Sequence, residues 1–425
     1  MIQRLAALLV GLIACQTLQA QITLEEYTRE VLAYSHELRD SELATQGARS
    51  AELAAHKGYL PFFSLMRQMN LDFRTPEVGR RWNWYMRLDV TQPIFRGGAV
   101  RAEAKQASLA YDMAEREEES VQLFVLYTAE VAYWTLSRRE NYLKAMTDYT
   151  NIVRSLSDVV RERYNEGYIS KSDLLQVESR LRDAEYQLSQ AVQQRDIALH
   201  NFNLLRGAEP TTQVLLTESI LDSRTLPLRA SVDDILAIHP DYARSHLGVD
   251  HAWWGIRATR SRYLPQIEVG AFGLMQPPQP HVKGGGTRLD GGILVSFSTP
   301  IFHFGERRHA VSAARSDYLR SVVAKEDVRD RVTLDESNGW TNLMLSYRRM
   351  LTADESLAIA RENLAISTYS YTEGLTTILD VLQAQLSWLQ IYSNAITAQY
   401  DYATAVAAYE YIACRPRRAE KREQR

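Results

Sequence analysis

Residues 164–177 read YNEGYISKSDLLQV, and residues 371–384 read YTEGLTTILDVLQA. Six of the fourteen aligned positions are identical, and the offset between the two stretches is 207 residues. Gly167 and Gly374 occupy the same place in the two copies. A repeat of this length indicates a duplicated half-domain, because solenoid proteins repeat every 20 to 50 residues or so.

Two further landmarks repeat in the same order along the chain. Tyr59-Leu60-Pro61 recurs as Tyr263-Leu264-Pro265, and Pro93-Ile94-Phe95 recurs as Pro300-Ile301-Phe302. In each copy a potential capping box, Thr23 with Glu26 or Ser231 with Asp234, opens a predicted helix that runs to the Tyr-Leu-Pro. Two strands, a long helix, a glycine break and a returning helix follow.

This order predicts the organisation of the chain. We expect the first repeat at 21–206, with a β-hairpin at 63–95 and a helical hairpin at 98–206. A linker at 207–230 leads to the second repeat at 231–414, with a β-hairpin at 266–302 and a helical hairpin at 305–414. We expect residues 415–425 to form a charged, disordered tail.

The predicted strands alternate between apolar and polar residues. One side of the second strand carries Trp82, Trp84, Met86, Leu88 and Val90, and the other carries Asn83, Tyr85, Arg87, Asp89 and Thr91. Each strand has about the ten residues that a tilted strand needs to cross hydrocarbon. Trp82, Trp84 and Tyr85 are typical of an aromatic girdle at a membrane surface, although a soluble two-sheet sandwich is an alternative.

The predicted helices are long and carry a coiled-coil seam. No proline interrupts the stretch from Gly98 to Tyr164, which at 1.5 Å per residue gives a helix of about 100 Å. Apolar residues step by three and four along both returning helices, at Leu174, Val177, Leu181, Ala184, Leu188 and Ala191, and at Val381, Ala384, Trp388, Ile391, Ala395, Ala398 and Tyr402. This pattern requires a partner helix.

The N-terminus has the features of a secretory signal peptide. Arg4 precedes the apolar run LAALLVGLIA at 5–14, and Leu18-Gln19-Ala20 offers a cleavage site, so we expect a signal peptide at 1–20. A minority interpretation is lipidation of Cys15. Cys15 and Cys414 are the only cysteines, so cleavage leaves no pair for an intramolecular disulfide.

Composition argues against several classes of function. The net charge of −3 gives no electrostatic reason to bind nucleic acid. His246 and His251 are five residues apart, which does not suit zinc binding on one helical face, and Gly284-Gly285-Gly286 lacks the Lys-Ser/Thr of a phosphate-binding loop. We therefore expect no enzyme, no catalytic residue, no metal and no cofactor.

Four membrane strands cannot close a barrel alone. A strand edge open to lipid leaves backbone groups unpaired, and closed barrels start at about eight strands. Several copies must then share one barrel. These arguments allow a dimer with eight strands or a trimer with twelve.

The set of motifs resembles the TolC family of outer-membrane efflux proteins over essentially the whole mature length. The matching features are the two Tyr-Leu-Pro helix ends, the strand exits Gln92–Gly98 and Thr299–Gly305, and the Tyr-x-x-Gly turns. The resemblance implies a mainly α fold with a small β part. It also implies a homotrimer with a twelve-stranded β-barrel in outer-membrane lipid and a coiled-coil α-barrel in the periplasm. The implied partners are a periplasmic adaptor and an inner-membrane transporter of the RND or ABC type.

The same resemblance implies roles for the hairpin tips. Adaptor docking would involve Tyr164, Gly167, Tyr371 and Gly374, and the periplasmic aperture would be lined by Asp173, Tyr371, Thr376, Asp380 and Gln383. This chain departs from the family pattern at Thr376, where an arginine is expected, and at Gln383, where an acidic residue is expected. Asp173 and Asp380 follow Ser170 and Thr377 by three residues, so both also fit capping boxes.

The resemblance leaves the cargo open. A tripartite efflux system that exports small molecules is the first interpretation, and a duct for type I protein secretion is the second. An exported coiled-coil scaffold without a pore would explain the heptads but not the alternating hairpins.

Overall fold

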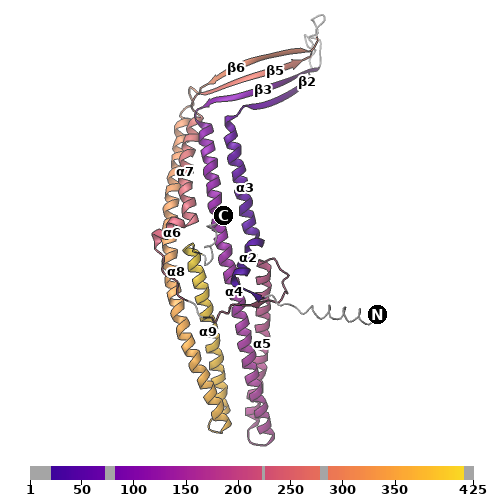
Figure 1. The fold of residues 1–425 in the computed structure, drawn as a ribbon, viewed down its shortest axis with the longest axis vertical. Coiled ribbons are helices and arrows are strands. Elements are labelled where there is room, and N and C mark those ends of the chain that lie inside the picture. The colour runs from indigo at the N-terminus through magenta and orange to yellow at the C-terminus, as the bar shows by residue number, and fades with distance from the viewer. Residues whose placement is uncertain (1–20, 72–81, 223–224, 278–285, 416–425) are drawn as a thin grey trace, which may run out of the picture. The chain divides into compact units, whose positions relative to one another are not determined.

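A computed structural model describes residues 21–71, 82–222, 225–277 and 286–415, with the side chains of Trp82 and Asn83 excluded (Figure 1). The expected signal peptide with Cys15 and the tail after residue 415 lie outside the described residues. The helices before the strands are α2 (Leu24–Tyr34), α3 (His36–His56), α6 (Val232–Ile238) and α7 (Pro240–Ser261).

The longest elements are two helices of 67 residues each, α4 (Ala99–Asn165) and α8 (Glu306–Thr372). Each is followed by a returning helix of 35 residues, α5 (Lys171–Leu205) after α4 and α9 (Ile378–Ile412) after α8. The prediction of two long helical hairpins is confirmed. At 1.5 Å per residue, each long helix measures about 100 Å.

The expectation of one helix before each Tyr-Leu-Pro is wrong, because each copy has two helices there. Pro240 begins α7 and cannot donate a backbone hydrogen bond, so α6 ends at Ile238. In the first copy Ser35 separates α2 from α3, and its Oγ accepts a hydrogen bond from the Leu38 amide at 3.2 Å.

The two predicted capping boxes at the start of the copies have different outcomes. Thr23 and Glu26 form a complete box, in which each side chain bonds to the backbone of the other residue. Ser231 occupies the N-cap position of α6, as predicted, but its side chain makes no capping hydrogen bond. The prediction of a second capping box is therefore wrong.

The chain divides into two compact units, which we describe separately. The first comprises residues 1–39, 120–239 and 331–425, and the second comprises residues 40–119 and 240–330. Each unit draws on both sequence repeats.

A four-stranded antiparallel sheet belongs to the second unit, in the order β2-β3-β5-β6. Its strands are β2 (Phe62–Leu71), β3 (Trp82–Arg96), β5 (Gln266–Gln276) and β6 (Arg288–Ser298). Pairing of β3 with β5 joins the two repeats in one sheet (Figure 1). The two outer strands, β2 and β6, each pair on one side only within the described chain.

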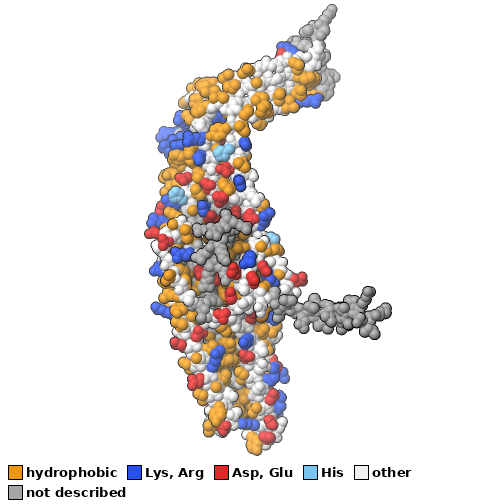
Figure 2. Space-filling view, viewed as in Figure 1, with side chains coloured by type: hydrophobic (Ala, Val, Ile, Leu, Met, Phe, Trp, Pro, Cys, Tyr) orange, Lys and Arg blue, Asp and Glu red, His pale blue; other side chains and the backbone are white. Residues whose placement is uncertain are grey.

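The register gives the sheet one apolar face. Successive side chains of a strand point to opposite faces, and paired residues share a face. The face of Trp84 carries Phe63, Leu65, Met69, Met86, Leu88, Val90, Ile267, Val269, Ala271, Met275, Leu289, Ile293, Val295 and Phe297. Arg67 is its one charged residue among those described. The predicted alternation is confirmed, and hydrophobic side chains cover much of the sheet in Figure 2.

The opposite face of the sheet holds its described carboxylates, Asp89, Glu268 and Asp290. On that face Arg87 Nε lies 2.9 Å from Asp89 Oδ1, and the Tyr85 hydroxyl hydrogen-bonds with Gln68. Tyr85 therefore lies opposite Trp84, as alternation requires. The role of these aromatics in a girdle stays a prediction, and the Trp82 side chain lies outside the described residues.

Gly97 fixes the strand-to-helix junction of the first repeat. Its φ is +60°, and a Cβ built there would lie 2.5 Å from the Ser261 carbonyl oxygen and 2.8 Å from Leu264 Cβ. No other residue tolerates both the left-handed backbone and this approach. The glycine in the strand-exit motif therefore brings the end of β3 against the end of α7.

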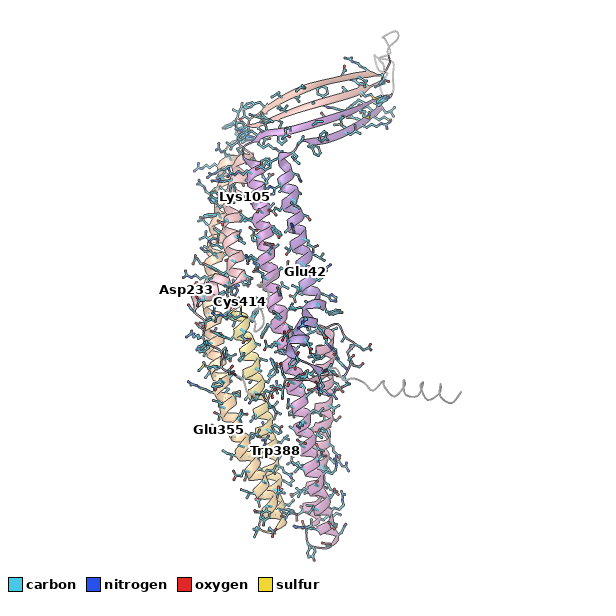
Figure 3. The ribbon with its side chains drawn as sticks, viewed as in Figure 1. Glu42, Lys105, Asp233, Glu355, Trp388 and Cys414 are labelled. Atoms are coloured by element: carbon cyan, nitrogen blue, oxygen red, sulfur yellow. The ribbon has the colours of Figure 1, made fainter. Side chains whose placement is uncertain are left out.

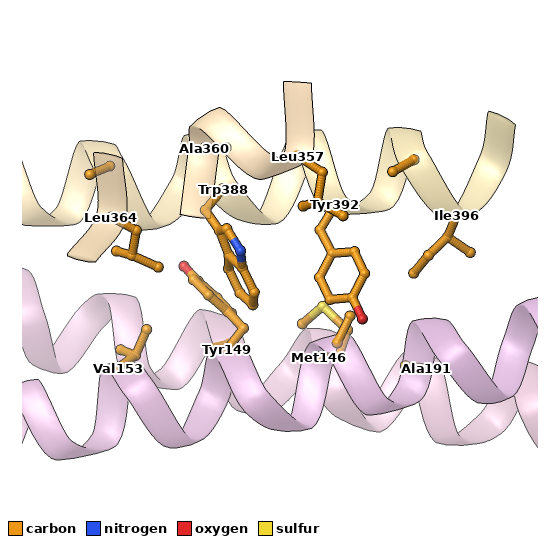
Figure 4. Packing of buried hydrophobic residues seen from close by; sticks show 14 of the residues in the cluster. Met146, Tyr149, Val153, Ala191, Leu357, Ala360, Leu364, Trp388, Tyr392 and Ile396 are labelled. Atoms are coloured by element: carbon orange, nitrogen blue, oxygen red, sulfur yellow. The ribbon is translucent and has the colours of Figure 1, made fainter. Parts of the chain in front are cut away.

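The predicted coiled-coil seam lies in the core of the first unit. Trp388 and Tyr392 of α9 point toward Met146 and Tyr149 of α4, with Leu357 of α8 close by (Figure 4). Of the predicted seam residues, those that are buried are Val177, Leu181, Ala184, Ala191, Val381, Ala384, Trp388, Ala395 and Tyr402. Leu174, Leu188 and Ile391 are partly buried against the same clusters.

The linker between the repeats is tied to the first unit by an ion pair. Arg229 Nε donates a hydrogen bond to Glu336 Oε1, and Arg229 Nη2 donates one to Glu336 Oε2, each at 2.9 Å. The Glu336 side chain is 1% exposed and that of Arg229 is 53% exposed. The Tyr409 hydroxyl lies 3.4 Å from Glu336 and accepts a hydrogen bond from the Ala230 amide.

Residues with a left-handed backbone conformation follow α5 and α9 at equivalent positions of the two repeats. Gly207 has φ +74°. Cys414, 207 positions later and labelled in Figure 3, has φ +50°. At both ends the amide of the following residue bonds back to the helix, from Ala208 to Asn203 and from Arg415 to Glu410. This is a Schellman motif, which favours glycine at the left-handed position. Cys414 adopts the conformation at a steric cost.

Replacing Cys414 with glycine is therefore expected to stabilise the protein by about 1 kcal/mol, because it removes that steric cost. Thermal unfolding in detergent measures the change. Cys414→Ala is the matched control, since it removes the thiol and keeps the Cβ. Equal stability of the two variants would show that the thiol, and not the backbone, sets the effect.

Candidate functional site

The two helical hairpins turn at matching tips, residues 163–173 and 370–380. Gly167 has φ +83° and Gly374 has φ +75°. The Tyr168 amide bonds to the Arg163 carbonyl at 2.9 Å, and the Leu375 amide bonds to the Ser370 carbonyl at 2.8 Å. Each long helix thus ends in a Schellman motif, which explains the glycine of the repeated Tyr-x-x-Gly.

The returning helices start with complete capping boxes. The Ser170 hydroxyl accepts from the Asp173 amide, and the Asp173 carboxylate accepts from the Ser170 amide. Thr377 and Asp380 repeat this arrangement, with the Thr377 amide 2.9 Å from Asp380 Oδ2. Hydrogen bonds from the Thr377 hydroxyl and amide lower the pKa of Asp380 below its ordinary 3.8. The exposed Asp380 is therefore a carboxylate at neutral pH.

An apolar cluster holds the two tips of one chain together. This tip cluster joins residues of all four helices of the two hairpins: Leu156, Val160, Val177, Tyr371, Ile378, Val381 and Leu382, with Ile169 and Leu174 packed against them. Tyr371 is only 6% exposed, so within one chain its ring belongs to this cluster.

One cation of the first tip contacts the second tip. The Arg163 guanidinium lies 5.0 Å from the centre of the Tyr371 ring, and its Nη2 is 3.4 Å from the Thr372 carbonyl oxygen. Both contacts favour the charged arginine. Arg163 therefore forms a polar bridge between the hairpins at their ends.

Two hydroxyls near this bridge have no hydrogen-bond partner among the described residues. They belong to Tyr371 and Thr376, and the oxygen atoms Tyr371 Oη and Thr376 Oγ1 are themselves buried from solvent. A buried hydroxyl without a hydrogen-bond partner costs free energy.

The remaining predicted tip residues lie near the surface. Gly167, Gly374 and Gln383 are exposed, and Tyr164 and Asp173 are intermediate. Large apolar side chains are exposed beside them, with Tyr168 at 77% and Leu375 at 75%. The structure thus brings all the predicted tip residues to one end of the first unit. Their separate roles stay predictions.

The described residues lack two features that are typical of other protein classes. Within the described ranges, no His, Cys, Asp and Glu side chains gather in threes or more to hold a metal ion. None of the described helices combines the length and apolarity needed to cross a membrane.

The family model described as "Outer membrane efflux protein" matches residues 27–208 and 232–410, which are the two repeats. The chain belongs to the outer membrane efflux protein family. The predicted resemblance to TolC-like proteins is thereby confirmed. The family is one of channels rather than enzymes, and it assigns the chain to the outer membrane, extending into the periplasm.

Two relatives of this efflux-family protein share a quarter or less of the aligned residues with it. It is 25% identical over 292 residues to the fusaric acid resistance protein FusA of Burkholderia cepacia, covering 66% of this chain and 54% of FusA. It is 21% identical over 326 residues to outer membrane protein TolC of Escherichia coli K12, covering 74% of this chain and 66% of TolC. The match thus spans between half and two thirds of these relatives.

The fold of this efflux-family protein is that of solved outer-membrane channels. The outer membrane protein VceC of Vibrio cholerae superposes with a TM-score of 0.76 at 18% identity, covering 92% of this chain and 95% of VceC. The expected fold class, mainly α with a small β part, is confirmed.

Sequence reasoning missed Arg163 as a functional candidate. It immediately precedes the repeated motif at Tyr164, and its counterpart in the second repeat is Ser370. That difference between the two copies, directly beside the repeated tyrosine, was the available signal. The contact itself joins residues more than 200 positions apart, which no local pattern reports.

Proposed function

We propose that three copies of this chain form the exit duct of a tripartite efflux system. Their twelve strands would share one barrel in the outer membrane, and their helical hairpins would form a periplasmic tunnel. A periplasmic adaptor and an inner-membrane transporter of the RND or ABC type would supply the cargo, which is small molecules.

The observation that carries this proposal is the sheet with its two open edges. β2 and β6 each pair on one side only, and the sheet has an almost wholly apolar face. In hydrocarbon, unpaired backbone groups at these edges would cost several kcal/mol each. Pairing of β2 with β6 of the next copy satisfies both edges and turns the apolar face to lipid.

The tips supply the closed end of the duct. The short contacts of Arg163 hold the two hairpins of one chain together, and the unpartnered hydroxyls of Tyr371 and Thr376 point to contacts with neighbouring chains. Threefold symmetry would turn Asp173, Asp380 and Gln383 into rings at this entrance. The exposed Tyr168 and Leu375, beside Gly167 and Gly374, offer apolar contacts for adaptor hairpins.

Substitutions of Asp380 test the proposed duct. Asp380→Ala is expected to raise single-channel conductance in planar bilayers and to weaken block by multivalent cations, because it removes three negative charges from the entrance. Asp380→Asn separates charge from capping, since the side-chain oxygen of asparagine can still accept the hydrogen bond from the Thr377 amide. If both variants keep the wild-type conductance and block, Asp380 does not line the entrance.

A further inference from the structure

The strand register shows which residues form the end of the sheet that connects to the helices. Arg96 of β3 pairs with Gln266 of β5, which pairs with Ser298 of β6. α7 ends just before β5, at Ser261, and α8 begins just after β6, at Glu306. In the proposed duct this end of the sheet marks the boundary where the chain leaves the hydrocarbon.

The residues next to this end of the sheet are strongly basic. The segments 256–265 and 299–310 contain five arginines and one carboxylate, Glu306. Glu306 accepts a hydrogen bond from the Tyr263 hydroxyl at 2.8 Å and lies 3.7 Å from His303. The end of α7 and the start of α8 are therefore in contact. Figure 2 shows Lys and Arg side chains gathered beside the sheet, over the ends of these helices.

Four of these arginines form a surface that we name the arginine collar: Arg260, Arg262, Arg307 and Arg308. All four are exposed. Within the described part of the chain, none of them has a carboxylate partner within 4.0 Å. Some arginines elsewhere on the long helices do have a carboxylate partner, as Arg161 has in Glu178 at 2.9 Å. The collar is thus an unneutralised concentration of positive charge.

Large apolar side chains stand beside the collar. Ile301 is 93% exposed, Phe302 71% and Phe304 91%, and the two phenylalanine rings contact each other at 4.7 Å between centres. Arginine next to exposed aromatic residues, directly after a membrane strand, is the composition of a membrane interface, where cations reach headgroups and rings reach the acyl boundary. Nucleic acid or an acidic protein would match the charge but not these apolar neighbours.

We infer that the arginine collar binds the phosphate headgroups of anionic phospholipids in the membrane leaflet from which the helices emerge. This inference rests on the proposed duct. Each basic residue near an anionic surface adds attraction that salt screens within about 10 Å. The collar would fix the depth of the channel and retain anionic lipid around it.

The chain offers a matched pair of variants to test the inference. Arg307→Gln/Arg308→Gln removes two collar charges. Arg348→Gln/Arg349→Gln removes a tandem pair from the same helix that is also exposed but lies far in sequence from the strands. The protein in phosphatidylcholine–detergent micelles is titrated with phosphatidylglycerol, and bound lipid is counted by native mass spectrometry.

We expect Arg307→Gln/Arg308→Gln to bind phosphatidylglycerol about 30-fold more weakly than wild type, and Arg348→Gln/Arg349→Gln to bind it unchanged. Equal affinity of the two variants would overturn the inference, as would displacement of the lipid by millimolar inorganic phosphate. Conductance of the wild type is recorded in parallel. A conducting wild type without preference for phosphatidylglycerol overturns the collar alone, whereas a wild type that does not conduct overturns the duct as well.

Discussion

Replacing Arg163 with alanine is expected to raise the single-channel conductance of the reconstituted protein by favouring an open entrance. The Arg163 contacts with the Tyr371 ring and the Thr372 carbonyl are individually weak, together about 1 to 1.5 kcal/mol. In a trimer whose three pairs of tips open together, the loss is about 3 to 4.5 kcal/mol. That is a change of more than about 100-fold in the ratio of closed to open channels.

Arg161→Ala is the matched control for this experiment. Arg161 lies two residues away on α4 and pairs with Glu178 of α5 at 2.9 Å, so its contact stays inside the first hairpin. We expect wild-type conductance from this variant. An equal increase in both variants, or none in either, would contradict the role of Arg163 as a bridge between hairpins. Thermal unfolding should be little changed in both, since both side chains lie near the surface.

Replacing Arg229 with alanine is expected to destabilise the folded chain by about 3 kcal/mol. The substitution removes both 2.9 Å hydrogen bonds to Glu336, whose side chain is 1% exposed, and so leaves a buried carboxylate without its cation. Thermal unfolding in detergent, followed by circular dichroism, measures the loss. Arg229→Ala combined with Glu336→Gln should recover part of it, because the buried charge is then absent.

The Arg229 pair also predicts a dependence on pH. The hydrogen bonds from Arg229 lower the pKa of the Glu336 carboxyl below its ordinary 4.5. The stabilisation is therefore present above about pH 4.5 and is lost as the pH falls through the lowered pKa of the folded state. We expect the difference in stability between wild type and Arg229→Ala to narrow in that acidic window. A constant difference down to pH 3 would contradict the ion pair as its source.

The helices and strands of this fold were predictable because their signals are local. The uninterrupted stretch after Gly98, the three-and-four spacing from Leu174 to Ala191 and the alternation around Trp84 each report a period that one element imposes on its own sequence. The duplicated order of motifs then indicated that β3 and β5 belong to corresponding hairpins. It did not predict that these two strands pair, which is a contact between repeats.

The predictions that failed depend on details that spacing does not encode. Ser231 has the right spacing to Asp234, but the cap hydrogen bond also requires a rotamer and a loop geometry that only the fold sets. The break between α2 and α3 at Ser35 contains no proline that would have predicted it. At the tips, the sequence indicated the capping of Asp380 but not the bridge from Arg163, because the register between two hairpins is fixed by the packing of the tip cluster.

The central claim, that each chain contributes one third of a shared membrane channel, is tested most directly by the mass of the native particle. The protein is extracted from the outer membrane in mild detergent, and its mass is measured by native mass spectrometry with lipid and detergent removed in the gas phase. We predict a particle of three chains that resists dilution. A monomer under these conditions would contradict the account, because β2 and β6 would then remain unpaired.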